Sequence, residues 1–209
     1  MKGLMSVAFL IVKENIIPSI VVLFIVSLIG ILEHSHLQAT SLLLVTFPTT
    51  YLMRSRSDVA QKFSKLEKIM PLTIKVIILS KYLIFLIFLW VSFGLMAIYL
   101  SVNFIINGTI LSLIEINLLL FTLGGLISFV SFFYPLSLQF KDSQHESLIG
   151  VAFLLPVMHI GLFVFVMNNT IFEVLNDTSA GFVYVISSII IFVISYLISK
   201  IIYSKKSYD

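Results

Sequence analysis

Six long apolar runs, separated by polar intervals, divide the chain of 209 residues. Each run is at least 17 residues long, and about 20 apolar residues are enough to cross the hydrocarbon core of a bilayer as a helix. We therefore predict an all-α, polytopic membrane protein with six transmembrane helices. The predicted spans are Ile16–Leu32, Leu37–Met53, Tyr82–Val102, Leu113–Leu138, Ser147–Met167 and Gly181–Tyr203.

A shorter apolar run, residues 3–12, precedes the first span. The run is too short to cross a membrane, and Lys13, Glu14 and Asn15 follow it where a signal peptide would need small residues for cleavage. We interpret residues 3–14 as a helix in the membrane interface, with Lys2 and Lys13 near the lipid headgroups. The alternative is that this segment extends the first span into the cytoplasm.

One long polar interval, Arg54–Lys81, interrupts the apolar pattern and holds 7 of the 13 Lys and Arg residues. Within it, the pattern of Asp58–Met70 predicts an amphipathic helix, because its apolar positions recur at steps of four, three and four residues. These apolar positions are Val59, Phe63, Leu66 and Met70. Lysines, including Lys62, fall on the other side, and Pro71 ends the helix.

The Lys and Arg residues are confined to alternate loops and to the two ends of the chain. The three remaining loops, residues 33–36, 103–112 and 168–180, contain none of the 13. Cytoplasmic loops of membrane proteins collect Lys and Arg. We therefore predict that both termini are cytoplasmic. The basic balance is then a signal of orientation and does not indicate nucleic-acid binding.

Composition supports a chain that is almost entirely membrane-embedded. Hydrophobic residues make up 59% of it and charged residues 11%, where a soluble domain has about 25% charged residues. We therefore treat residues 1–209 as a single transmembrane domain. The absence of cysteine excludes disulfides, thiolate metal sites and cysteine catalysis. The abundance of Ile, Lys and Asn is typical of a low-GC bacterium, which predicts the bacterial cytoplasmic membrane.

Two ionisable residues in the spans are candidates for a transport pathway. His159 lies near the middle of the fifth span, and ionisable groups at that depth are costly and often functional. A neutral imidazole bonded to a neighbouring helix explains the same residue equally well. Glu115 lies at the boundary of the fourth span, where it meets a substrate or is simply solvated.

Other chemistry finds little support in the sequence. Glu33, His34 and His36 cluster in one turn, but a metal site needs more ligands than this turn offers, so we favour a polar turn. No cofactor motif is present, and no Ser–His pair, paired aspartates or His-Glu-x-x-His run points to an intramembrane enzyme.

The polar interval also resembles the segment between the second and third spans of ABC-2 type permeases. The residues that carry this resemblance are Lys68-Ile69-Met70-Pro71-Leu72-Thr73, followed by Ile77-Ile78-Leu79-Ser80-Lys81-Tyr82-Leu83. Six spans, cytoplasmic termini and an interfacial N-terminal helix are also similar to the small six-span group of this family, which includes exporters of phenol-soluble modulins and antimicrobial peptides. Met70 departs from the leucine that is usual there.

The resemblance implies that the amphipathic helix is a coupling helix that docks on a separate ATP-binding subunit, present as a dimer. The implied interface comprises Val59, Lys62, Phe63, Leu66, Met70 and Pro71. The sequence has no Gly-x-x-x-x-Gly-Lys-Ser/Thr motif of its own. The resemblance further implies a second permease subunit, identical or related, and export of an amphipathic peptide or lipid-like substrate.

Two other functions remain open from the residues alone. A non-transporting membrane protein, such as a bacteriocin immunity or sensor protein, would rest the same amphipathic helix on lipid. A secondary transporter would need a network of ionisable groups within the membrane, for which His159 is the main candidate.

Overall fold

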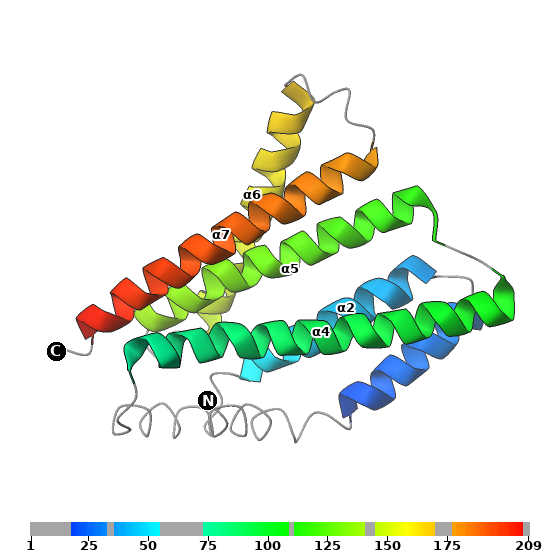
Figure 1. Ribbon diagram of the computed structural model, residues 1–209, viewed down its shortest axis with the longest axis horizontal. Coiled ribbons are helices and arrows are strands. Elements are labelled where there is room, and N and C mark those ends of the chain that lie inside the picture. The colour runs from blue at the N-terminus through cyan, green and yellow to red at the C-terminus, as the bar shows by residue number, and fades with distance from the viewer. Residues whose placement is uncertain are drawn as a thin grey trace. The chain divides into compact units, whose positions relative to one another are not determined.

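Figure 1 shows a computed structural model of the chain, in which residues 18–32, 36–54, 73–108, 111–140, 145–169 and 177–206 are described. Helices make up almost all of these residues, and no strand occurs among them. The predicted all-α, polytopic class is therefore confirmed. The predicted interfacial helix, residues 3–14, lies outside the described residues.

The chain divides into two compact units, Met1–Leu111 and Ser112–Asp209. In the first unit the described helices are Pro18–Leu32, α2 (His36–Arg54) and α4 (Ile74–Asn107). The second unit contains α5 (Leu113–Gln139), α6 (His145–Asn169) and α7 (Asp177–Lys206). The assignment of residues 1–209 to one domain stays a prediction.

Four helices are long and apolar enough to cross a membrane: α4, α5, and the stretches Ser147–Val166 of α6 and Ser179–Lys205 of α7. They match the last four predicted spans. The first two helices fall short of the same criterion among the described residues. Pro18–Leu32 has 15 residues, a length of about 22 Å against a hydrocarbon core of about 30 Å, and α2 is interrupted by polar residues.

The polar residues of α2 bond largely to their own helix. Five hydroxyl groups donate to backbone carbonyls four residues earlier, over distances of 2.6–2.8 Å. They belong to Thr40, Ser41, Thr46, Thr49 and Thr50. Because each hydroxyl is satisfied within the helix, the polar content of α2 is compatible with an apolar surrounding.

Helix α2 packs against α4 in the first unit, and both meet the helix Pro18–Leu32. The rings of Tyr51 and Phe88 stack with their centroids 5.1 Å apart. In the helix Pro18–Leu32, a Cβ atom at Gly30 would lie 2.6 Å from the Cβ of Ala39 in α2 and 2.7 Å from the hydroxyl oxygen of Tyr99 in α4. Glycine therefore permits the helix Pro18–Leu32 to approach both α2 and α4.

Helix α4 is a single element of 34 residues that begins directly after Thr73, whose backbone is extended. It ends at Gly108, which has a φ of 66° and donates its N–H to the carbonyl of Phe104. A length of 34 residues corresponds to about 51 Å. Residues Ile74–Lys81, which belong to the polar interval, therefore continue into the predicted third span as one helix.

Candidate functional site

The second unit is built on a parallel pair of helices, α5 and α7, which lie side by side in Figure 1. Near the beginning of both, the side-chain oxygen of Asn117 accepts the N–H of Gly181 at 2.9 Å. Two turns further on, in both helices, Gly124 faces Ser188. The next pair is Ser131 and Ser195, joined by a bond from the serine hydroxyl of α7 to the backbone carbonyl of α5.

These three pairs share one sequence offset, 64 residues, so both helices run in the same direction and advance by seven residues at each step. A seven-residue repeat of contacts is the pattern of helices that wind around each other with a left-handed twist. Small residues at such positions permit close approach in membranes, where packing rather than hydrophobicity drives association. The α5–α7 pair is therefore a tightly packed frame for the side chains between its helices.

Gly124 receives the ring of Tyr184. A Cβ atom at position 124 would lie 2.5 and 2.6 Å from two ring carbons of Tyr184 and 3.2 Å from the hydroxyl oxygen of Ser188. Tyr184 is completely buried. Because no side chain larger than hydrogen fits here without movement, glycine at position 124 permits the tyrosine ring to lie against α5.

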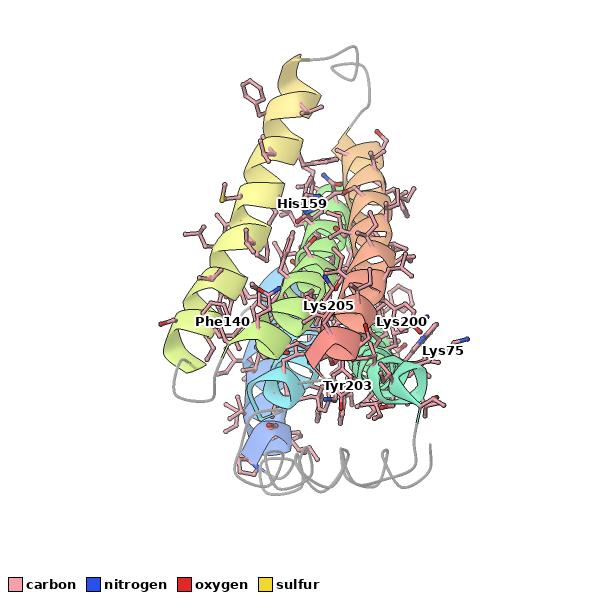
Figure 2. The ribbon with its side chains drawn as sticks, turned by 90° about the vertical axis from the view of Figure 1, so that its left-hand side faces the viewer. Lys75, Phe140, His159, Lys200, Tyr203 and Lys205 are labelled. Carbon is pink, nitrogen blue, oxygen red and sulfur yellow. The ribbon has the colours of Figure 1, made fainter. Side chains whose placement is uncertain are left out.

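His159 reaches this frame from α6, and Figure 2 shows it where α6 faces α5 and α7. Its Nδ1 lies 2.9 Å from the hydroxyl oxygen of Ser128 on α5. Its Nε2 lies 3.4 Å from the hydroxyl oxygen of Ser187 on α7. The sequence left open whether His159 bonds to a neighbouring helix, and the structure shows that it contacts both helices of the pair.

Hydrogen bonds extend the cluster across α7. Ser128 donates to the hydroxyl of Ser188 at 3.0 Å, and Ser188 and Ser187 both donate to the backbone carbonyl of Tyr184, at 2.9 and 2.7 Å. The cluster thus joins one imidazole and three hydroxyls from three helices. A connected network of this kind avoids the cost of bare polar groups in an apolar surrounding.

Aromatic rings pack against Tyr184, whose backbone carbonyl belongs to the cluster. The ring of Tyr184 lies 5.0 Å from that of His159, 5.2 Å from that of Phe121 and 5.1 Å from that of Phe163, measured between centroids. Phe121 and Phe163 also contact each other edge-on at 6.1 Å. Ser128 and Ser188 are completely buried beside these rings, whereas His159 and Ser187 are partly exposed.

The pairing of Ser128 with His159 corrects the sequence-based statement that the chain offers no Ser–His pair. The pair still lacks the features of a nucleophilic site. Ser128 is completely buried, so a substrate atom does not reach its hydroxyl, and no carboxylate orients the imidazole within the described residues of α5, α6 and α7. Catalysis by a serine needs both. We therefore read the pair as structural.

Glu115 has a different place. It forms a capping box at the beginning of α5, in which its carboxylate accepts the N–H of Ser112 at 2.7 Å while its own N–H donates to the Ser112 hydroxyl at 3.3 Å. Ser128, the partner of His159, lies 13 residues further along α5, a distance of about 20 Å. The structure does not bring the two candidate pathway residues together.

The residues of the expected coupling helix lie outside the described residues. These are Val59, Lys62, Phe63, Leu66, Met70 and Pro71. The described chain resumes at Thr73, and Lys75 is exposed on the first turn of α4. The Glu33–His36 turn is described only at His36, whose Nδ1 lies 3.3 Å from the Tyr99 hydroxyl. Among the described residues no group of three metal-ligating side chains is found.

A family model described as an ABC-2 family transporter protein matches residues 3–204. Searches of curated proteins and of solved structures found no match. The matched range includes both units and every described helix but for the last two residues of α7. It also includes the polar interval that carried the resemblance in the sequence. The chain is therefore a multi-pass membrane protein that belongs to the ABC-2 transporter family, as a permease.

Proposed function

We propose that this permease is the membrane subunit of an exporter in the bacterial cytoplasmic membrane, with both termini in the cytoplasm. Permeases of this family work in a membrane with an ATP-binding subunit. In the proposed assembly a dimer of ATP-binding subunits drives two permease chains, identical or related. The observation that carries the proposal is the family match over residues 3–204.

The proposed coupling element is the segment of about residues 54–81, with the apolar stripe Val59, Phe63, Leu66 and Met70 as its docking surface. Apolar and aromatic residues at the centre of an interface supply most of its binding energy, and a polar rim surrounds them. Lys62 belongs to that rim, and Pro71 ends the docking helix.

The continuity of α4 supports this proposal. About eight residues, Ile74–Lys81, precede the predicted span in the same unbroken helix, which corresponds to about 12 Å. A helix without a break transmits a displacement at its beginning to the rest of its length. Movement of the segment that ends at Pro71 would reach α4 through two intervening residues, Leu72 and Thr73, and would then be carried along the unbroken helix into the span.

The proposed cargo is an amphipathic or hydrophobic molecule such as a peptide. His159 is proposed to face the transport route in at least one state, because ionisable side chains at that depth often mark a pathway. The boundary position of Glu115 makes it a second candidate, and its role in the helix cap offers a structural explanation for the same residue.

Co-purification of the chain with the products of its neighbouring genes, assayed for an ATP-binding subunit, tests the coupling proposal. The double substitution Phe63→Asp and Leu66→Asp is expected to abolish association, because it places two charges in the apolar centre of the interface. Gln61→Asp with Ser64→Asp is the matched control: it adds the same charge to the same segment on the opposite side of the predicted helix.

The control variant is expected to retain the ATP-binding subunit. If the stripe variant retains it as well, the segment is not the docking surface. If no ATP-binding subunit associates with the wild-type chain, and a peptide of residues 57–71 instead binds vesicles of anionic lipid, the proposal fails in favour of a non-transporting membrane protein.

A further inference from the structure

The hydrogen bonds of the His159 cluster assign each of its protons, beginning at the backbone carbonyl of Tyr184. This carbonyl accepts the hydroxyl of Ser187 at 2.7 Å and the hydroxyl of Ser188 at 2.9 Å. A carbonyl oxygen only accepts hydrogen bonds, and a serine hydroxyl carries a single proton. The protons of both serines are therefore committed to this carbonyl.

Ser128 is the next group in the chain of hydrogen bonds. Its hydroxyl oxygen lies 3.0 Å from that of Ser188, and because the proton of Ser188 is committed, Ser128 is the donor of this bond. Ser128 has then used its own proton and keeps only acceptor positions. The hydroxyl of Tyr184, which lies near both serines, can donate to one of these positions and leaves the assignment unchanged.

The imidazole of His159 must therefore donate to Ser128. The distance of 2.9 Å between Nδ1 and the hydroxyl oxygen of Ser128 is a normal length for an N–H···O bond. The spanning stretches of α6 and α7 contain no Asp or Glu, and that of α5 contains only Glu115, about 20 Å from Ser128. A charged imidazole without a counter-charge is costly at this depth, so the ring is neutral and carries its one proton on Nδ1.

Nε2 of His159 is then left as an acceptor without a donor. The hydroxyl oxygen of Ser187 lies 3.4 Å from it, which is longer than the range of about 2.7–3.2 Å for hydrogen bonds between nitrogen and oxygen. The proton of Ser187 is moreover directed at the carbonyl of Tyr184. One nitrogen of the ring is therefore satisfied within the cluster, and the other is available to a group from outside it.

The available nitrogen lies on the accessible side of the cluster. Ser128, the partner of Nδ1, is completely buried, whereas His159 and Ser187 are both partly exposed. The exposed surface therefore lies beside the contact between Nε2 and Ser187. Helix α6 packs along α5 and makes no comparable packing with α7, so the edge between α6 and α7 is the direction from which a molecule can approach.

Apolar side chains flank this edge on both helices. Large exposed residues adjoin His159 along α6 and Ser187 along α7, and each exposes more than half of its surface. They are Met158, Leu162, Ile186 and Ile190. A molecule that reaches Nε2 must therefore be compatible with an apolar surrounding and must also offer a proton for a hydrogen bond.

We propose that Nε2 of His159 is the acceptor in a binding site for an apolar or amphipathic molecule that donates one N–H or O–H, such as an amide or a hydroxyl group. This inference rests on the proposed function, to which it adds the polarity of recognition. A cargo that offers a donor at this point is bound, and one that offers only an acceptor is not. The site belongs to a single chain, so it is testable on the permease alone.

Nitrogen NMR of the full chain in lipid nanodiscs, with isotopically labelled histidine, tests the assignment of the protons. The chain has four histidines, and His159→Gln identifies the resonances of this one. Nδ1 is expected to resonate as a protonated nitrogen and Nε2 as an unprotonated one. Ser187→Ala should leave this pattern unchanged, because the Ser187 hydroxyl donates elsewhere. Ser128→Ala should raise the share of the form protonated on Nε2, because Nδ1–H loses its acceptor.

The matched probes for the binding site are n-octanol and octyl methyl ether, which share an apolar chain and differ in the hydroxyl proton. Added to the nanodiscs, n-octanol should move the Nε2 resonance upfield, as expected when an acceptor nitrogen receives a hydrogen bond, and the shift should saturate. Octyl methyl ether should leave the resonance in place. The Nδ1 resonance should move less with either probe, because Ser128 is completely buried.

Three results overturn the inference. The first is a protonated Nε2 in the wild-type chain. The second is an equal response to the two probes, which means that the donor is not recognised. The third is an Nε2 resonance that n-octanol does not move, which leaves the position to water or to nothing. None of these measurements involves an ATP-binding subunit, so the site and the proposed coupling fail separately.

Discussion

The glycine at the centre of the second unit gives the sharpest test of how α5 and α7 meet. Gly124→Ala adds one methyl group, which would lie 2.5 Å from a ring carbon of Tyr184. Carbon atoms in contact lie about 3.5–4.0 Å apart, so the ring or the helix must move by about 1 Å. The ring has little freedom, because Tyr184 is completely buried and touches Phe121 and Phe163.

The magnitude follows from two opposing effects. Overpacking of this kind costs roughly 1–3 kcal/mol, whereas replacing glycine by alanine inside a helix gains up to about 1 kcal/mol. Gly161→Ala and Gly94→Ala isolate the second effect, because a Cβ atom at either position has nothing within 4 Å. We therefore expect Gly124→Ala to be less stable than these two controls by about 1–3 kcal/mol.

Unfolding in mixed micelles with increasing SDS, followed by circular dichroism, measures the free energy of each variant. A second comparison identifies the cause: on a Tyr184→Ala background, where the ring is absent, Gly124→Ala should lose most of its cost. Non-additivity of this kind is expected for residues in direct contact. If Gly124→Ala is as stable as the two controls, the described packing of Tyr184 against α5 is wrong.

Two further predictions concern the first helix contact and the cap of α5. Gly30→Ala should destabilise the chain by about 1–3 kcal/mol relative to Gly94→Ala. Tyr99→Phe should recover part of this loss, because it removes the oxygen that lies 2.7 Å from the added methyl group. The same unfolding assay measures both effects, and equal stability of Gly30→Ala and Gly94→Ala would contradict the prediction. Ser112→Ala should cost about 1 kcal/mol of stability, because it removes the helix cap of α5. Glu115→Gln keeps the capping geometry and should leave stability unchanged. A loss of export in Glu115→Gln at normal stability would assign the carboxylate to the transport route.

Long apolar runs were sufficient to predict most of the helices. The predicted span Leu113–Leu138 differs from α5 by one residue, and α4 contains the whole of the predicted span Tyr82–Val102 but begins eight residues before it. Length and hydropathy identify such helices reliably, because a backbone in lipid must satisfy its own hydrogen bonds. Helix ends were less well predicted in α7, which begins four residues before the expected Gly181.

The sequence did not identify which side chains meet. His159 was recognised as unusual, but its partners Ser128 and Ser187 lie 31 and 28 residues away. In a membrane both lipid and protein interior are apolar, so hydrophobic periodicity does not mark the packed face of a helix. The available signal was the seven-residue spacing of Gly181, Ser188 and Ser195, which indicates a packed face without naming the helix that packs there.

The hydroxyl groups of α2 have a consequence for how that helix can behave. Thr40, Ser41, Thr46, Thr49 and Thr50 each carry their acceptor within the same helix. Rotation of α2 about its axis, sliding along a neighbour or a change of neighbour would therefore break none of these five bonds. Such a helix can move without breaking the hydrogen bonds of these hydroxyl groups, in contrast to a helix whose hydroxyls bond to other helices.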